Sequence, residues 1–116
     1  SMIVEALLHK KKIRQKEWED YDHLTRQILG TDTRDLLNTS ADELIARHAD
    51  TPDGMEKLEL AAVNMLKLAE EVDEDNPLLK SRLRQEGIQL LKYIQQHSDN
   101  YSLQREFLIG LLETNH

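Results

Sequence analysis

The chain of 116 residues contains no cysteine, only two prolines and four glycines, and few aromatic residues: one Trp, one Phe and three Tyr. The absence of cysteine excludes disulfide bonds, thiolate catalysis and cysteine-ligated zinc sites. Glycine and proline are too scarce for the many turns of an all-β domain, and with so few aromatic residues leucine must dominate the core.

Long apolar runs are also missing. The longest contain four residues, as at 60–63, whereas about 20 are needed to cross a bilayer. The N-terminus meets a charged run within ten residues and lacks the apolar core of a secretory signal. We therefore expect no membrane segment and a cytoplasmic protein. The net charge of −7 disfavours binding to nucleic acid, which is itself a polyanion.

The residues that are abundant favour helices. Leu, Glu, Lys, Gln and Ala fill long stretches, and apolar residues recur every three or four positions, as on one face of a helix. The pattern predicts a long helix over residues 3–29, a short helix or turn over 31–38, and helices over 41–49, 55–74, 77–97 and from 101 or 102 to about 112. Gly30 is placed to end the first helix, Ser40 with Glu43 forms a capping box, and Asn76-Pro77 starts a helix.

Short connections make consecutive helices antiparallel neighbours. We expect one all-α domain over residues 1–116, with a long N-terminal helix (1–30) and a core of antiparallel helical hairpins (31–116), either TPR-like or an irregular bundle. It would have four main helices and one short one. The wide apolar arc of residues 55–74 predicts a central helix. Gly87 predicts a close helix crossing, because a glycine inside a helix costs about 0.5–1 kcal/mol relative to alanine.

The segment 36–112 carries a Leu36-Leu37 pair, the Ser40 and Glu43 capping box, and the stretch Lys-Leu-Glu-Leu-Ala-Ala at 57–62. In this order of features it resembles an uncharacterised bacterial family with TPR-like helical hairpins. The resemblance implies a helical scaffold for protein contact, and it implies no catalytic residue.

One residue group suggests a different function. Asp20 and Glu19 precede His23 by three and four positions, which is half of the Glu-x-x-His geometry of di-metal sites in helical bundles. Such a site needs further carboxylates from other helices. The alternatives are a metal- or small-ligand-binding bundle, with a degenerate enzyme as one form of it, and an ordinary surface ion pair.

Two charged runs also have alternative interpretations. Residues 10–16 carry five fixed positive charges, which favours either phosphate or nucleic-acid binding or a solvated helix face, since acidic residues follow at once. Residues 70–75 carry five carboxylates at the expected C-terminus of a helix, where the helix dipole disfavours anions. That run is either a patch for a cation or a basic partner, or a solubilising loop.

Aromatic residues are the candidate partner-binding positions: Trp18, Tyr21, Tyr101 and Phe107. Trp and Tyr dominate binding hot spots. The serines lie at helix caps and turns, where their hydroxyls act as caps, so no nucleophilic arrangement is indicated. We expect a non-catalytic protein–protein interaction or assembly module without a cofactor.

The first predicted helix raises the question of self-association. At 1.5 Å per residue, 27 residues span about 40 Å, which is longer than the other helices. Its first turns carry Ile3, Val4, Leu7 and Leu8, whose apolar side chains need to be buried against another surface. The alternatives are a homodimer through the N-terminal helix and a monomer in which this helix bends back.

Overall fold

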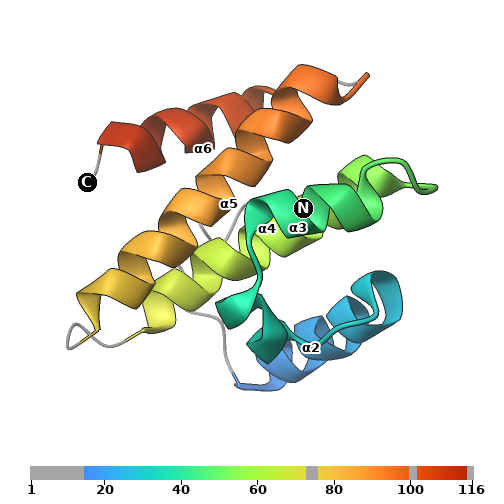
Figure 1. Cartoon of the computed structure of the whole chain (residues 1–116). Helices are drawn as coiled ribbons and strands as arrows, with labels where there is room; N and C mark the ends of the chain where they lie inside the picture. Colours follow the sequence, from blue (N-terminus) through green and yellow to red (C-terminus); the bar gives the residue numbers. More distant parts are fainter. Residues whose placement is uncertain (1–14, 73–75, 100–101, 115–116) are drawn as a thin grey trace.

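The computed structural model describes residues 15–72, 76–99 and 102–114, without the side chains of residues 15–18 and 21 (Figure 1). Within these ranges the chain forms helices and no strand, so the all-α prediction is confirmed. The elements are α2 (Gln15–Leu29), the 3₁₀ helix η1 (Thr33–Asn38), α3 (Ala41–His48), α4 (Gly54–Glu71), α5 (Pro77–His97) and α6 (Leu103–Thr114).

The antiparallel pair α4–α5 forms the centre of the bundle. Figure 1 shows α3, α4, α5 and α6 as successive antiparallel neighbours, with α2 beside α4 and α6 beside α5. Within α4, residues 61–67 are all buried. Seven consecutive residues of an α-helix point in every direction around its axis, so α4 is surrounded, as its wide apolar arc predicts.

The core consists mostly of leucine, again as predicted. Its fully buried large side chains come from η1, α3, α4 and α5, so the core is continuous through the middle of the bundle. They are Leu36, Leu44, Leu58, Met65, Leu66, Leu83, Leu90, Leu91 and Ile94.

Gly87 marks the point where α4 and α5 cross. A Cβ atom at Gly87 would lie 2.7 Å from Leu66 Cγ and 3.3 Å from the Ala62 carbonyl oxygen. These distances leave no room for a methyl group, so the predicted close crossing is confirmed. Another tight approach joins α3 to α4, where a Cβ on Gly54 would lie 2.4 Å from the His48 carbonyl oxygen.

Helix ends follow the local signals closely. Gly30 has φ +72° directly after α2, and the Asp32 carboxylate caps η1 by accepting from the Asp35 N–H. Helix α5 begins at Pro77 behind the Asn76 cap, as predicted. Helix α4 begins one residue earlier than predicted, at Gly54, and ends at Glu71 rather than Glu74. The first part of the helix predicted over 3–29 lies outside the described residues.

The capping box at α3 forms only in part. Ser40 Oγ accepts from the Glu43 N–H at 3.1 Å, but the Glu43 carboxylate pairs with Arg47 at 3.6 Å. The N–H of Ala41, the first residue of the helix, donates to the Glu86 carboxylate on α5, at 2.7 Å. A side chain from a distant helix therefore satisfies one of the free N–H groups at the start of α3.

Arg82, one turn before Glu86 on α5, holds the same connection. Its guanidinium donates to the Leu37 carbonyl oxygen and, at 3.2 Å, to that of Thr39. Leu37 lies in the last turn of η1, and Thr39 lies in the link between η1 and α3. Arg82 and Glu86 on α5 thus hold the end of η1 and the start of α3 in place.

Polar contacts also connect α2 to α4 and to η1. Asn64 Nδ2 on α4 donates to Thr25 Oγ1 at 2.8 Å, and both residues are buried. Asp22 accepts from the Thr33 N–H at 3.0 Å and from the Thr33 hydroxyl at 2.9 Å. The Thr33 N–H bond is the main cause that lowers the pKa of the Asp22 carboxyl, and Arg26, at 3.1 Å, lowers it further.

Candidate functional site

Helix α6 carries apolar residues on two opposite faces. One face is buried against the bundle through Leu108 and Ile109. On the other, Leu103 is 77% exposed and Phe107 is 61% exposed. A helix that only packs on its own core has a single apolar face, so the second face needs a different explanation.

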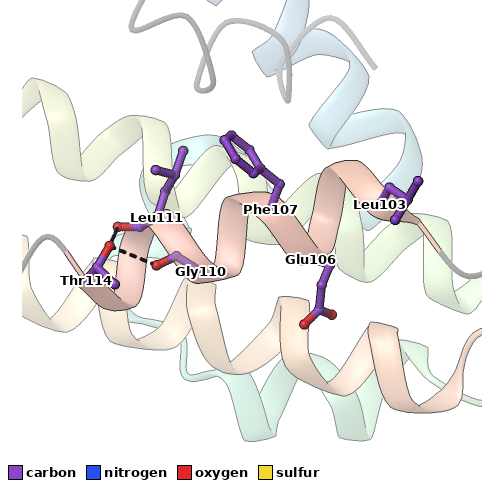
Figure 2. Close-up of a pocket in the computed structure, with 6 residues that line it drawn as sticks. All are labelled: Leu103, Glu106, Phe107, Gly110, Leu111 and Thr114. Carbon is purple, nitrogen blue, oxygen red and sulfur yellow. Dashed lines mark hydrogen bonds between the residues drawn. The ribbon is translucent and has the colours of Figure 1, made fainter.

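The exposed face forms a continuous apolar surface along α6. We call it the α6 stripe, and its members are Leu103, Phe107, Gly110 and Leu111. With Glu106 and Thr114 they line a shallow open groove (Figure 2). Figure 2 shows Phe107 and Leu111 pointing to the same side of α6, whereas Glu106 points to the opposite side.

Polar contacts connect α6 to α4 and α5 beneath this stripe, and the one at Arg105 is buried. Arg105 is 6% exposed, and its Nε donates to Gln95 Oε1 on α5 at 2.9 Å. Its guanidinium also lies 3.7 Å from the Glu59 carboxylate on α4. Lys92 pairs with Glu113 at 2.8 Å near the other end of α6. The stripe is therefore presented by a helix that a buried arginine anchors near its N-terminal end.

The anchoring role of Arg105 was not predicted from the sequence. A charged residue is expected at the surface, yet Arg105 is three and four positions before Leu108 and Ile109 and so shares their face. That spacing was the available signal.

Phe107 is the predicted contact residue that the structure describes in full. Tyr101 lies outside the described residues. Trp18 and Tyr21 belong to α2, but their side chains are not among those described. Phe107 lies in the α6 stripe, and Leu103 and Leu111, which the sequence analysis did not single out as contact residues, lie beside it.

The metal hypothesis gains no further ligands from the described part of the chain. Asp20 and His23 are exposed on α2. Across residues 15–72, 76–99 and 102–114, no group of three or more His, Asp or Glu side chains is placed to hold an ion.

One member of the acidic run at 70–75 has a structural partner. Glu70 accepts from Lys67 Nζ at 2.7 Å, and the Lys67 side chain is 1% exposed. A buried ammonium needs such a partner, because removing a charge from water is costly. Residues 73–75 of this run and residues 10–14 of the basic run lie outside the described residues.

His48 is half-buried at the C-terminal end of α3. Burial lowers the pKa of His48, and the nearby Lys57 and Arg47 charges lower it further. His48 lies at the tight turn between α3 and α4, where its carbonyl oxygen accepts from the Thr51 hydroxyl at 2.6 Å.

No described helix is both long enough and apolar enough to cross a membrane. Comparisons of the chain with protein-family models, with curated proteins and with solved structures gave no match.

Proposed function

We propose that the chain is a non-catalytic helical protein–protein interaction or assembly module, and that the α6 stripe is its binding surface. The observation that carries this proposal is the exposure of Leu103 and Phe107, at 77% and 61%, in an apolar groove. Contiguous exposed apolar surface marks interaction sites in proteins. Aromatic residues such as Phe107 are enriched at protein interfaces.

The spacing of the stripe indicates the kind of partner. Leu103, Phe107 and Leu111 follow one another at intervals of four residues and span about 12 Å of helix. An amphipathic helix with apolar residues at i, i+4 and i+7 presents a matching surface. The net charge of −7 favours a partner helix with basic residues next to its apolar face.

Two earlier expectations stay predictions within this proposal. They are the TPR-like character of the hairpins and a homodimer through the N-terminal helix. Both are compatible with a module whose activity is contact with another helix.

Two substitutions on α6 test the proposal. Phe107→Asp places a charge in the stripe, and Gln104→Asp places the same charge at an exposed position outside the residues that line the groove. Tagged full-length chains are purified from the native host, and a protein retained by wild type is then titrated against each purified variant by calorimetry.

We expect a partner that binds wild type and Gln104→Asp alike and binds Phe107→Asp at least about tenfold more weakly, as for a residue at the centre of an interface. Its binding should show a negative heat-capacity change from apolar burial. Equal binding to both variants would refute the α6 stripe as the surface.

A further inference from the structure

The α3–α4 turn, residues 48–54, is tightly packed. A Cβ atom on Gly54 would lie 2.4 Å from the His48 carbonyl oxygen and 2.6 Å from that of Ala49. The His48 carbonyl oxygen also accepts from the Thr51 N–H at 3.0 Å and from the Thr51 hydroxyl at 2.6 Å. The Gly54 N–H donates to the Thr51 carbonyl oxygen at 3.0 Å. The backbone that carries the His48 ring is therefore held from several sides.

The His48 ring has a buried nitrogen without a partner. Nε2 is shielded from water, and among the described residues nothing forms a hydrogen bond with it. An uncharged imidazole carries a hydrogen on only one of its nitrogens, whereas a charged imidazolium carries one on both. Charging the ring in the closed turn therefore buries an N–H donor that has no acceptor, an arrangement that folded proteins avoid.

The charges that act on this ring are positive. Lys57 is three residues after Gly54 on α4, and its Nζ donates to Thr51 Oγ1 at 3.0 Å. Arg47 precedes His48 on α3. Burial is the main cause that lowers the pKa of His48, and the Lys57 and Arg47 charges lower it further. This net direction is opposite to the effect of the α3 dipole, whose C-terminal end favours a cation.

The acidic groups around the α3–α4 turn do not offset these charges. Asp50 and Asp53 in the turn and Glu56 in the first turn of α4 are exposed, and solvent and salt weaken the effect of exposed charges. Glu43 on α3 is paired with Arg47.

Helix α5 brings no carboxylate to the ring within the described residues. It runs in the same direction as α3, because both are antiparallel to α4 (Figure 1). Asp42 near the start of α3 bonds to Gln89, so the end of α3 lies nearer the end of α5. The ionisable groups there are Lys92, which is paired with Glu113 of α6, and the exposed His97.

We infer that His48 makes the α3–α4 turn a pH switch: the turn is closed while the ring is uncharged, and protonation of the ring favours opening of the turn. In the open form the ring reaches water, which accepts from Nε2–H. The switch includes no residue of the α6 stripe, so the inference goes beyond the proposed function and does not depend on it.

The direction of the pH dependence follows from proton binding. In the open form the ring has the ordinary histidine pKa of about 6.5, whereas in the closed form its pKa is lower. Above about pH 6.5 neither form binds the proton, and the closed turn has its full stability. As the pH falls from about 6.5 toward the lower pKa of the closed form, the open form binds more protons and the closed turn loses stability.

Opening of the turn loosens one end of the core. Leu44 is one turn before His48 on α3, and Leu58 is one turn after Gly54 on α4; both are fully buried. The start of α3 stays attached to α5 through the bond from Ala41 to Glu86. Acid therefore releases the C-terminal end of α3 while the rest of the bundle stays folded, as in other local unfolding reactions.

Amide hydrogen exchange of the full-length chain, resolved by residue with NMR, tests the switch. The N–H groups of Ala49 and Gly54 report on the turn, because they donate to the carbonyls of Ile45 and Thr51. Their protection, corrected for the intrinsic exchange rate, is compared at about pH 7.5 and about pH 5.5. We expect it to fall about three- to tenfold, up to the factor by which a histidine of pKa about 6.5 favours its charged form one pH unit lower.

Two variants identify the responsible group. His48→Leu removes the ring and should reduce the change at Ala49 and Gly54 to less than about twofold. The matched control is His23→Leu, which removes a histidine that is exposed on α2 and should keep the wild-type change. If circular dichroism shows that His48→Leu does not fold, His48→Gln replaces it and should behave in the same way.

The N–H groups of the buried residues Leu90 and Leu91 in the middle of α5 separate local opening from unfolding of the bundle. They should be much better protected than Ala49 and Gly54 at both pH values. Equal protection would overturn the inference, because the turn would then open only when the whole chain unfolds.

Two other results would also overturn it. One is protection of Ala49 and Gly54 that does not change with pH in the wild-type chain. The other is a change that persists in His48→Leu, since another group would then be responsible. The measurement needs no partner, so its failure leaves the proposed function standing, and a failed partner search leaves this inference standing.

Discussion

Replacing Gly87 by alanine tests the closest contact in the bundle. The new Cβ would lie 2.7 Å and 2.9 Å from Cγ and Cδ2 of Leu66 and 3.3 Å from the Ala62 carbonyl oxygen. Leu66 is 2% exposed, so it cannot move into solvent, and the two helices have to separate or Leu66 has to change rotamer. Overpacking of this kind costs about 1–3 kcal/mol, and alanine returns about 0.5–1 kcal/mol of helix propensity. We expect a net loss of about 1 kcal/mol.

Gly110 provides the matched control, because it is also inside a helix. A Cβ at Gly110 meets no atom within 4 Å, so Gly110→Ala should stabilise the chain by about 0.5–1 kcal/mol through propensity alone. Urea denaturation followed by circular dichroism gives both values from the shift of the midpoint. If Gly87→Ala were as stable as Gly110→Ala, the close crossing of α4 and α5 would be refuted.

Two further substitutions test polar contacts between elements. Arg82→Met removes the donor to the Leu37 and Thr39 carbonyls and should cost about 1.5–3 kcal/mol; an unchanged urea midpoint would contradict this. Asp22→Asn tests the lowered pKa of Asp22. A carboxyl whose folded pKa is depressed contributes stability above its unfolded pKa of about 3.9, and this contribution is lost as the pH falls further. The variant should be less stable at pH 6 and lose less stability between about pH 4 and pH 2; parallel pH profiles would contradict the role of the Thr33 bonds.

The elements that sequence analysis predicted well are those set by neighbouring residues. Gly30, Ser40 and the pair Asn76-Pro77 act on the backbone within a few positions, so their effect can be recognised from sequence alone. The central position of α4 was also predictable, because its apolar arc is too wide for one neighbour. The position of Gly87 predicted where α4 and α5 cross. A glycine inside a helix is unfavourable unless close packing requires it.

The polar contacts that fix the arrangement were not predictable in the same way. Glu86 accepts from Ala41 across 45 positions, and Asn64 donates to Thr25 across 39. No local pattern relates residues so far apart. Glu43 has the spacing of a capping-box partner, but in the bundle its carboxylate pairs with Arg47.

The candidate site was predictable by residue type and not by position. Phe107 was singled out because aromatic residues often bind partners. Leu103 and Phe107 are exposed, whereas Leu108 is buried. This difference depends on which face of α6 meets α5. The buried Arg105 lies on the packed face, where it is hydrogen-bonded to Gln95 and paired with Glu59, and these partners lie on two other helices.

The most direct test of the central claim is photo-crosslinking in the native host from a photoreactive phenylalanine analogue placed at Phe107. The account predicts an adduct with another protein through one of its amphipathic helices, and no such adduct when the analogue is placed at Gln104 on the same helix. Identical adducts from both positions, or adducts with this chain alone, would contradict the assignment of the α6 stripe as a surface for protein partners.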